Sequence, residues 1–107
     1  MLPQEKIKNL IDRHLKLEQE LSSGVIDKNK YAEISKEYSD LNEIIKHAKD
    51  YLNFEKETKD LNNIINDKNS DRDLKEFASL ELENLKNNFI INETKIKLFL
   101  LPKDLAD

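Results

Sequence analysis

Residues 31–65 read YAEISKEYSDLNEIIKHAKDYLNFEKETKDLNNII, and this run contains neither glycine nor proline. Since those two residues interrupt helices most strongly, nothing in the run breaks an α-helix. Asp27 precedes the run and is suited to cap a first turn. The sequence therefore predicts one helix from roughly Lys28 to Asp67, on the order of 60 Å long. One face of it is marked by residues that recur mostly at spacings of three and four, namely Tyr31, Ile34, Tyr38, Leu41, Ile45, Ala48, Leu52, Phe54, Thr58, Leu61 and Ile65.

A shorter helix is predicted before this run. Pro3 fits the first turn of a helix, because its missing N–H has no partner at that position in any case. The segment Ser22-Ser23-Gly24 predicts where the helix ends. Its apolar face is formed by Ile7, Leu10, His14, Leu17 and Leu21.

A third helix is predicted after the polar cluster 66–71, which reads as a turn. Ser70 and Asp73 have the spacing of a capping box, so we expect Ser70 to cap this helix. The helix stops before Pro102, because the residue before a proline disfavours helical geometry, and it is on the order of 45 Å long. Its main face carries Ala78, Leu82, Leu85, Phe89, Asn92, Ile96 and Phe99.

Together these elements predict an all-α fold: an elongated antiparallel three-helix bundle that tapers to a coiled-coil hairpin, with a short first helix and two long ones. The first helix should lie along the early part of the second, and the end of the third should return to that region. A helix with two neighbours needs a wider apolar face. We therefore expect a second row on the third helix, formed by Ile91, Thr94, Leu98 and Leu101, to face the first helix.

The composition excludes several classes of function. The 18 basic and 22 acidic residues give a net charge of −4, which argues against a domain that grips phosphate backbones. The chain has no cysteine and thus no disulfide or thiolate site, in keeping with a reducing compartment, and its start does not resemble a signal peptide. No apolar run is long enough to span a membrane, so the expected location is the cytoplasm.

Residues suited to chemistry are scarce. Gly24 is the only glycine, which excludes the glycine-rich loops that bind nucleotides. His14 and His47 lack a second ligand at metal-site spacing, and Glu33 with Glu37 lacks the Glu-x-x-His partners of a carboxylate-bridged site. We therefore predict no catalytic, cofactor-binding or metal-binding residue, and no enzyme. The expected roles are structural: His14 lies at the edge of the core, His47 is exposed, and Asn92 either fixes helix alignment or lies by chance at the edge of its seam.

Two segments carry a resemblance to a known family. Residues 31–41, YAEISKEYSDL, resemble the second-helix segment of bacterial class I peptide chain release factors of the release factor one type, and residues 98–104, LFLLPKD, are similar to the junction that follows the hairpin in that family. The resemblance implies a helical N-terminal domain over residues 1–101 and, at 102–107, the start of a linker to the codon-reading and release-loop domains. The Pro-x-Thr and Gly-Gly-Gln motifs of those domains match no residue here.

For this segment the resemblance implies a docking role in translation termination, without catalysis and without cofactors. Its partners would be the stalk base of the large ribosomal subunit and the methyltransferase that modifies the release-loop glutamine. From the net charge and the short apolar runs we also expect no membrane association and no sequence-specific nucleic-acid binding of its own. The candidate docking element is the turn farthest from the linker, formed by Asp67, Lys68, Asn69, Ser70, Asp71 and Arg72.

A second interpretation remains open, a free-standing coiled-coil adaptor or homodimerising structural protein. It is motivated by the long seams and by large apolar residues in the two-helix region that are expected to lack cover: Tyr51, Phe54, Phe77 and Leu80. We expect the isolated domain to be a monomer, which sedimentation can test.

Overall fold

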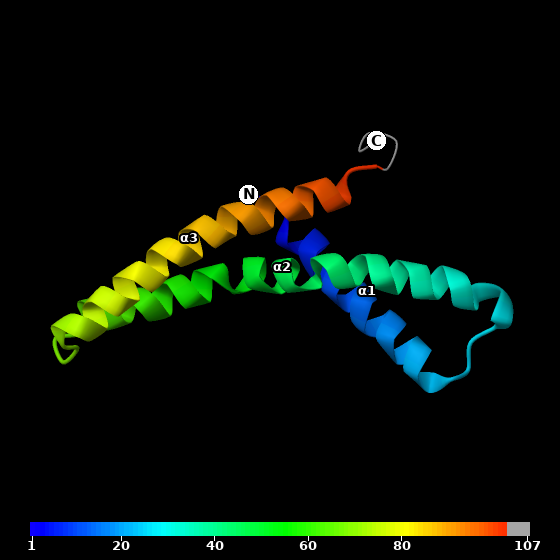
Figure 1. The fold of residues 1–107 in the computed structure, drawn as a ribbon, viewed down its shortest axis with the longest axis horizontal. Helices are drawn as coiled ribbons and strands as arrows, with labels where there is room; N and C mark the ends of the chain where they lie inside the picture. The colour runs from blue at the N-terminus through cyan, green and yellow to red at the C-terminus, as the bar shows by residue number, and fades with distance from the viewer. Residues whose placement is uncertain (103–107) are drawn as a thin grey trace.

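The computed structural model describes residues 1–102 and consists of three α-helices, α1 (Gln4–Ser23), α2 (Lys28–Asn66) and α3 (Arg72–Leu100). The molecule is elongated, with extents of 61 × 34 × 20 Å (Figure 1). The all-α architecture, with one short and two long helices, is confirmed. The three helices begin and end within about two residues of the predicted positions.

Local signals at the helix ends explain these bounds. Gly24 ends α1 in the left-handed conformation, with φ of 71°, which glycine adopts without steric cost. Asp27 caps α2 as predicted, and its side chain accepts the backbone N–H of Asn29 at 3.1 Å.

The cap of α3 differs from the prediction. Asp71, and not Ser70, is the N-cap, and its carboxylate accepts the backbone N–H of Leu74 at 2.8 Å. Ser70 instead belongs to the turn, where its backbone N–H donates to the carbonyl of Asp67. A charged carboxylate at the positive end of a helix is the stronger acceptor of the two adjacent candidates.

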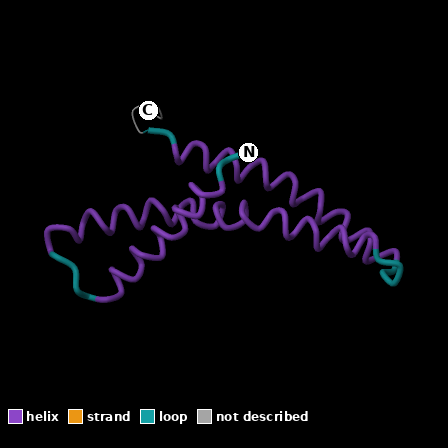
Figure 2. Tube along the Cα trace, turned by 180° about the vertical axis from the view of Figure 1, so that it is seen from behind, coloured by secondary structure: helices purple, strands orange, loops and turns teal. Residues whose placement is uncertain are grey.

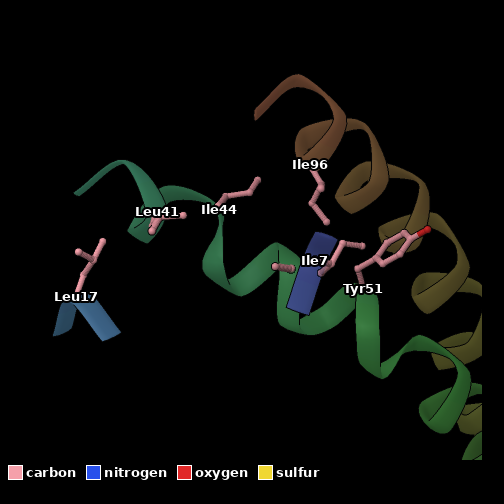
Figure 3. Packing of buried hydrophobic residues seen from close by; sticks show 7 residues of the cluster. Ile7, Leu17, Leu41, Ile44, Tyr51 and Ile96 are labelled. Atoms are coloured by element: carbon pink, nitrogen blue, oxygen red, sulfur yellow. The ribbon is translucent and has the colours of Figure 1, made fainter. Parts of the chain in front are cut away.

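The helix α2 is the axis on which the other two pack. Its first half lies against α1 and its second half against α3, and the connecting turns make both pairs antiparallel (Figures 1 and 2). The start of α1 reaches α3 only near the middle of the molecule. There Ile7 of α1, Tyr51 of α2 and Ile96 of α3 point toward one another and are almost fully buried (Figure 3). We call this region the junction.

The prediction that α1 and α3 share a wide contact is wrong. Ile91, Leu98 and Leu101 of the second row are 48%, 60% and 43% exposed, and Thr94 is exposed as well. The reason is the course of α1, which meets α3 through its first turns and then follows α2 on the other side (Figures 1 and 2). The triple bundle is therefore confined to the junction.

The large apolar residues of the two-helix region divide into two groups. Tyr51 is buried and stacks on Phe89 with ring centroids 4.7 Å apart, and Phe54 lies 4.1 Å from the same ring, so the expectation that these two lack cover is wrong. Phe77 and Leu80 are 60% and 62% exposed, as expected.

Two histidines link helices. His47 is half-buried and not exposed as predicted, because its Nδ1 donates to Oδ1 of the buried Asn92 at 2.8 Å. Asn92 thus has a partner on α2, which favours the alignment role over chance placement. His14 is half-buried, stacks on Tyr38, and has Nε2 2.6 Å from Oδ1 of Asn42, in agreement with a position at the edge of the core.

Candidate docking surface

The turn between α2 and α3 forms one tip of the molecule and is held by its own hydrogen bonds. The Asp67 carboxylate accepts the N–H of Asn69 at 2.9 Å, and the Asp71 carboxylate caps α3. These two acids are therefore occupied in shaping the turn. Lys68 and Asn69 are exposed, and the Arg72 side chain remains 90% exposed although its Nε donates to Glu76 at 3.1 Å.

An open groove of about 610 Å³ runs beside this turn. The six predicted residues contribute two acidic and two basic side chains, so the turn as a whole is electrically balanced. Because Asp67 and Asp71 bind their own backbone, the basic groups of Lys68 and Arg72 are the charges best placed to meet another molecule. The groove is lined by Ser70, Arg72, Lys75, Glu76, Ser79 and Leu80.

Exposed apolar side chains adjoin the same turn on α3. Leu74, Phe77 and Leu80 follow one another at spacings of three and are all exposed; we call them the tip patch. A contiguous exposed apolar group beside polar residues is typical of protein interaction sites. The sequence indicated that Phe77 and Leu80 lack cover but did not assign them to the docking element. The signal was their position outside the main apolar face of α3.

Three of the side chains suited to chemistry, His14, His47 and Glu37, have structural partners. Glu37 forms a bidentate ion pair with Arg13, at 2.6 and 2.9 Å, which joins α2 to α1. The hydrogen bonds from Arg13 hold the pKa of the Glu37 carboxyl below its ordinary value. Among residues 1–102 no group of three or more histidine, aspartate or glutamate side chains is arranged to hold a metal ion. None of the three helices has the length and apolar character that a membrane crossing requires.

The junction also contains a polar cluster around Tyr51. Its hydroxyl accepts the backbone N–H of Leu2 at 2.9 Å and donates to Glu93 at 3.3 Å. Burial raises the pKa of Tyr51, and the hydrogen bond from Lys97 lowers the pKa of Glu93. These contacts fix the start of the chain against α2 and α3, so the cluster has a structural role.

Comparison with known proteins identifies the family. The model of the PCRF domain matches residues 10–107, which is most of the chain. The chain belongs to the PCRF domain family. It is 54% identical over 107 residues to peptide chain release factor 1 of Pelagibacter ubique (strain HTCC1062), and 34% identical over 106 residues to that of Rhizobium rhizogenes (strain K84 / ATCC BAA-868). No solved structure matches the chain significantly.

The matches to these two relatives cover almost the whole of this chain but only part of each relative. They include 100% and 99% of this chain, and 30% and 29% of the two release factors. The resemblance that was read from residues 31–41 and 98–104 is confirmed. The helical, non-catalytic character of the PCRF domain agrees with the prediction that this segment is not an enzyme.

Proposed function

We propose that this PCRF domain is the N-terminal docking domain of a stop-codon-recognising peptide chain release factor, acting in translation termination in the cytoplasm. The observation that carries the proposal is the 54% identity to peptide chain release factor 1 over the whole chain. In this proposal residues 1–101 form the domain and residues 102–107 begin the linker to the codon-reading and release-loop domains. Residues 103–107 of that linker lie outside the described residues.

Deletion tests this function. In the full-length factor, removal of residues 1–104 should weaken association with ribosomes or slow factor recycling, because the docking surface is lost. Stop-codon choice should remain unchanged, because the residues that read the codon lie in another domain. Ribosome association, factor recycling and stop-codon choice are measured with ribosomes programmed with each stop codon. A changed codon preference after the deletion would count against the proposal.

The proposed docking element is the tip, residues 67–72, and its proposed partner is the stalk base of the large ribosomal subunit. Support comes from the exposure of Lys68 and Arg72, the adjoining groove, and the tip patch. Basic side chains at an exposed end increase the rate at which a protein meets an acidic surface. The tip is also the part of α3 farthest from the proposed linker (Figure 1).

Charge reversal tests this assignment. The double variant Lys68→Glu with Arg72→Glu in the full-length factor should lower the association rate with stop-codon-programmed ribosomes, most strongly at low salt, without lowering the melting temperature. The matched control is Lys8→Glu with Lys16→Glu on exposed positions of α1, which changes the net charge by the same amount. Equal loss in both variants would show a general charge effect and would remove the tip from the proposal.

The second proposed partner is the methyltransferase that modifies the release-loop glutamine. Its support is the resemblance together with exposed apolar side chains at the tip, which suit protein contacts. The purified methyltransferase should modify the factor lacking residues 1–104 more slowly than the intact factor. Equal methylation rates would restrict the docking role to the ribosome.

Self-association is the competing role for the same exposed surfaces. Sedimentation of the 107-residue chain at micromolar concentration distinguishes self-association from docking to another molecule. We expect a monomer with full helicity. A stable dimer would favour the coiled-coil adaptor.

A further inference from the structure

A second exposed apolar surface lies at the opposite end of α3 from the tip. Ile91 and Leu98 fall on one stripe of α3 seven residues apart, Leu101 follows three residues later as the C-cap, and Ile90, 64% exposed, flanks them. We call these four residues the chain-end patch. Three of its residues, Ile91, Leu98 and Leu101, belong to the row that the sequence indicated as a contact face with the first helix, and Ile90 was not part of that row.

Nothing among residues 1–102 covers the chain-end patch. At about 100° per residue its stripe lies on roughly the opposite side of α3 from Asn92 and Ile96, which pack toward α2. Once past the junction, α1 runs along α2 and away from α3 (Figures 1 and 2). The last three turns of α3 therefore present apolar side chains to the outside.

One residue of the patch, Leu98, also borders a groove of about 340 Å³ where α2 and α3 diverge. Leu98 forms part of its wall, and Ile44 and Phe99 add apolar surface. Glu43 and Lys95 contribute one charge of each sign. A protruding apolar side chain could thus enter between the helices while its neighbours cover Leu98, which is the geometry of a contact between domains.

We propose that the part of the full-length factor that follows this chain packs on the chain-end patch and the adjoining groove. This inference rests on the proposed function only in taking the chain as the N-terminal part of a longer factor, since the chain spans 30% of its Pelagibacter relative. The patch ends at Leu101, directly before Pro102. In the proposed function the linker begins at residue 102, directly beside the patch.

The short tether explains why a modest patch suffices. Loop closure costs little for a short connection, and a tethered partner is present at an effective concentration in the millimolar range. The tip patch has no such advantage, because a following domain would have to reach back along nearly the whole of α3, roughly 40 Å. The two patches thus fit different partners: the tip fits a separate molecule, and the chain-end patch fits the rest of the same molecule.

Thiol labelling tests the inference directly. The chain has no cysteine, so Leu98→Cys places a single reactive thiol on the patch. The labelling rate is measured in the 107-residue chain and in the full-length factor, both without ribosomes, by mass spectrometry of the peptide that contains residue 98. We expect labelling to be at least tenfold slower in the full-length factor. Leu15→Cys on α1, which replaces a residue 51% exposed, is the matched control and should react equally fast in both.

Three outcomes would overturn the inference: equal labelling of Leu98→Cys in both proteins, equal slowing at Leu15→Cys, or protection in the 107-residue chain that grows with concentration and so marks self-association. Ile91→Cys provides a second position should Leu98→Cys perturb folding. Because the labelling uses free factor, a failure of ribosome docking at the tip would leave its result unchanged. If Leu98→Cys is labelled equally fast in both proteins while the full-length factor still binds ribosomes, this inference fails and the proposed function stands.

Discussion

The junction and the tip of the molecule are built from the same two long helices, yet they differ in how many layers cover them. At the junction three helices meet, and Ile7, Ala48 and Ile96 are fully buried. In the arm that leads to the tip only α2 and α3 are present, and Ala78 is the one fully buried residue of α3 there. Burial requires neighbours on more than one side, so two helices alone leave half of each surface exposed.

The comparison teaches where stability and interaction reside. Buried apolar area provides most of the free energy of folding, so the junction should contribute more per residue than the arm. The arm in turn keeps large apolar residues available at its end. A stable junction thus supports an exposed tip, and substitutions should separate the two.

The largest expected effect comes from Ile96→Ala at the junction. Removing a fully buried isoleucine side chain loses its transfer free energy and leaves a cavity, so the free energy of unfolding should fall by about 3 kcal/mol. Urea unfolding followed by circular dichroism measures it. Leu80→Ala in the arm, where the side chain is 62% exposed, should change stability by less than about 1 kcal/mol. Equal losses would contradict the division into junction and arm.

A smaller effect is expected from Asn92→Ala, which removes the partner of His47 between α2 and α3. Leaving a half-buried donor unpaired should cost about 1–2 kcal/mol of unfolding free energy. The matched experiment is a double-mutant cycle with His47→Ala, in which the pair should show a coupling of about 1 kcal/mol. Strictly additive losses would mean that the hydrogen bond contributes nothing to the alignment of the helices.

At the tip, Asp71→Ala should cost about 1 kcal/mol, because the first turn of α3 loses its cap. Ser70→Ala should cost less, since the side chain of Ser70 does not cap the helix. Amide hydrogen exchange should accelerate in the first turn of α3 and stay unchanged at the junction. The reverse ranking of the two variants would restore Ser70 as the cap.

The smallest effect is expected at Glu37, which pairs with Arg13 in the part where only α1 and α2 are in contact. The pair is about 40% exposed, with side-chain exposures of 43% for Arg13 and 41% for Glu37, so Glu37→Gln should cost about 0.5 kcal/mol or less at neutral pH. Because the folded-state pKa of Glu37 is lowered, the contribution is present above the ordinary value of 4.5 and is lost as the pH falls through the lower folded value.

Thermal unfolding of the parent and of Glu37→Gln across this pH range measures the difference, which should shrink in acid and in high salt. Glu33→Gln, one turn earlier and exposed, is the control. A difference that grows on acidification would have the wrong sign for a lowered pKa.

Local signals made the helices predictable. Gly24, Asp27 and Pro102 act within one turn of their own positions, and the spacing of Tyr38, Leu41 and Ala48 marks one face of α2 without reference to the rest of the fold. The prediction of Ser70 as the cap failed because the adjacent Asp71 also suits an N-cap, and its carboxylate accepts the N–H of Leu74 in the first turn of α3.

Contacts between distant segments were not predictable from the same signals. His47 lies 45 residues from Asn92, and no residue near His47 in the sequence indicates the hydrogen bond between them. The row of Ile91, Leu98 and Leu101 showed that a face of α3 is apolar, but apolar character does not say which neighbour covers it. Of the six residues of the tip, Asp67 to Asp71 lie between the two helices and Arg72 is the first residue of α3, and the role of all six in docking stays a prediction.

The distance between the junction and the tip has a mechanical consequence for the arm. From Ile96 to Arg72 the helix α3 extends roughly 36 Å, so a tilt of about 5° at its base would move the far turn by about 3 Å. A displacement of that size exceeds the tolerance of a hydrogen bond. The position of the tip relative to α1 therefore depends on contacts far from it, among them those of Ile7, Tyr51 and Ile96.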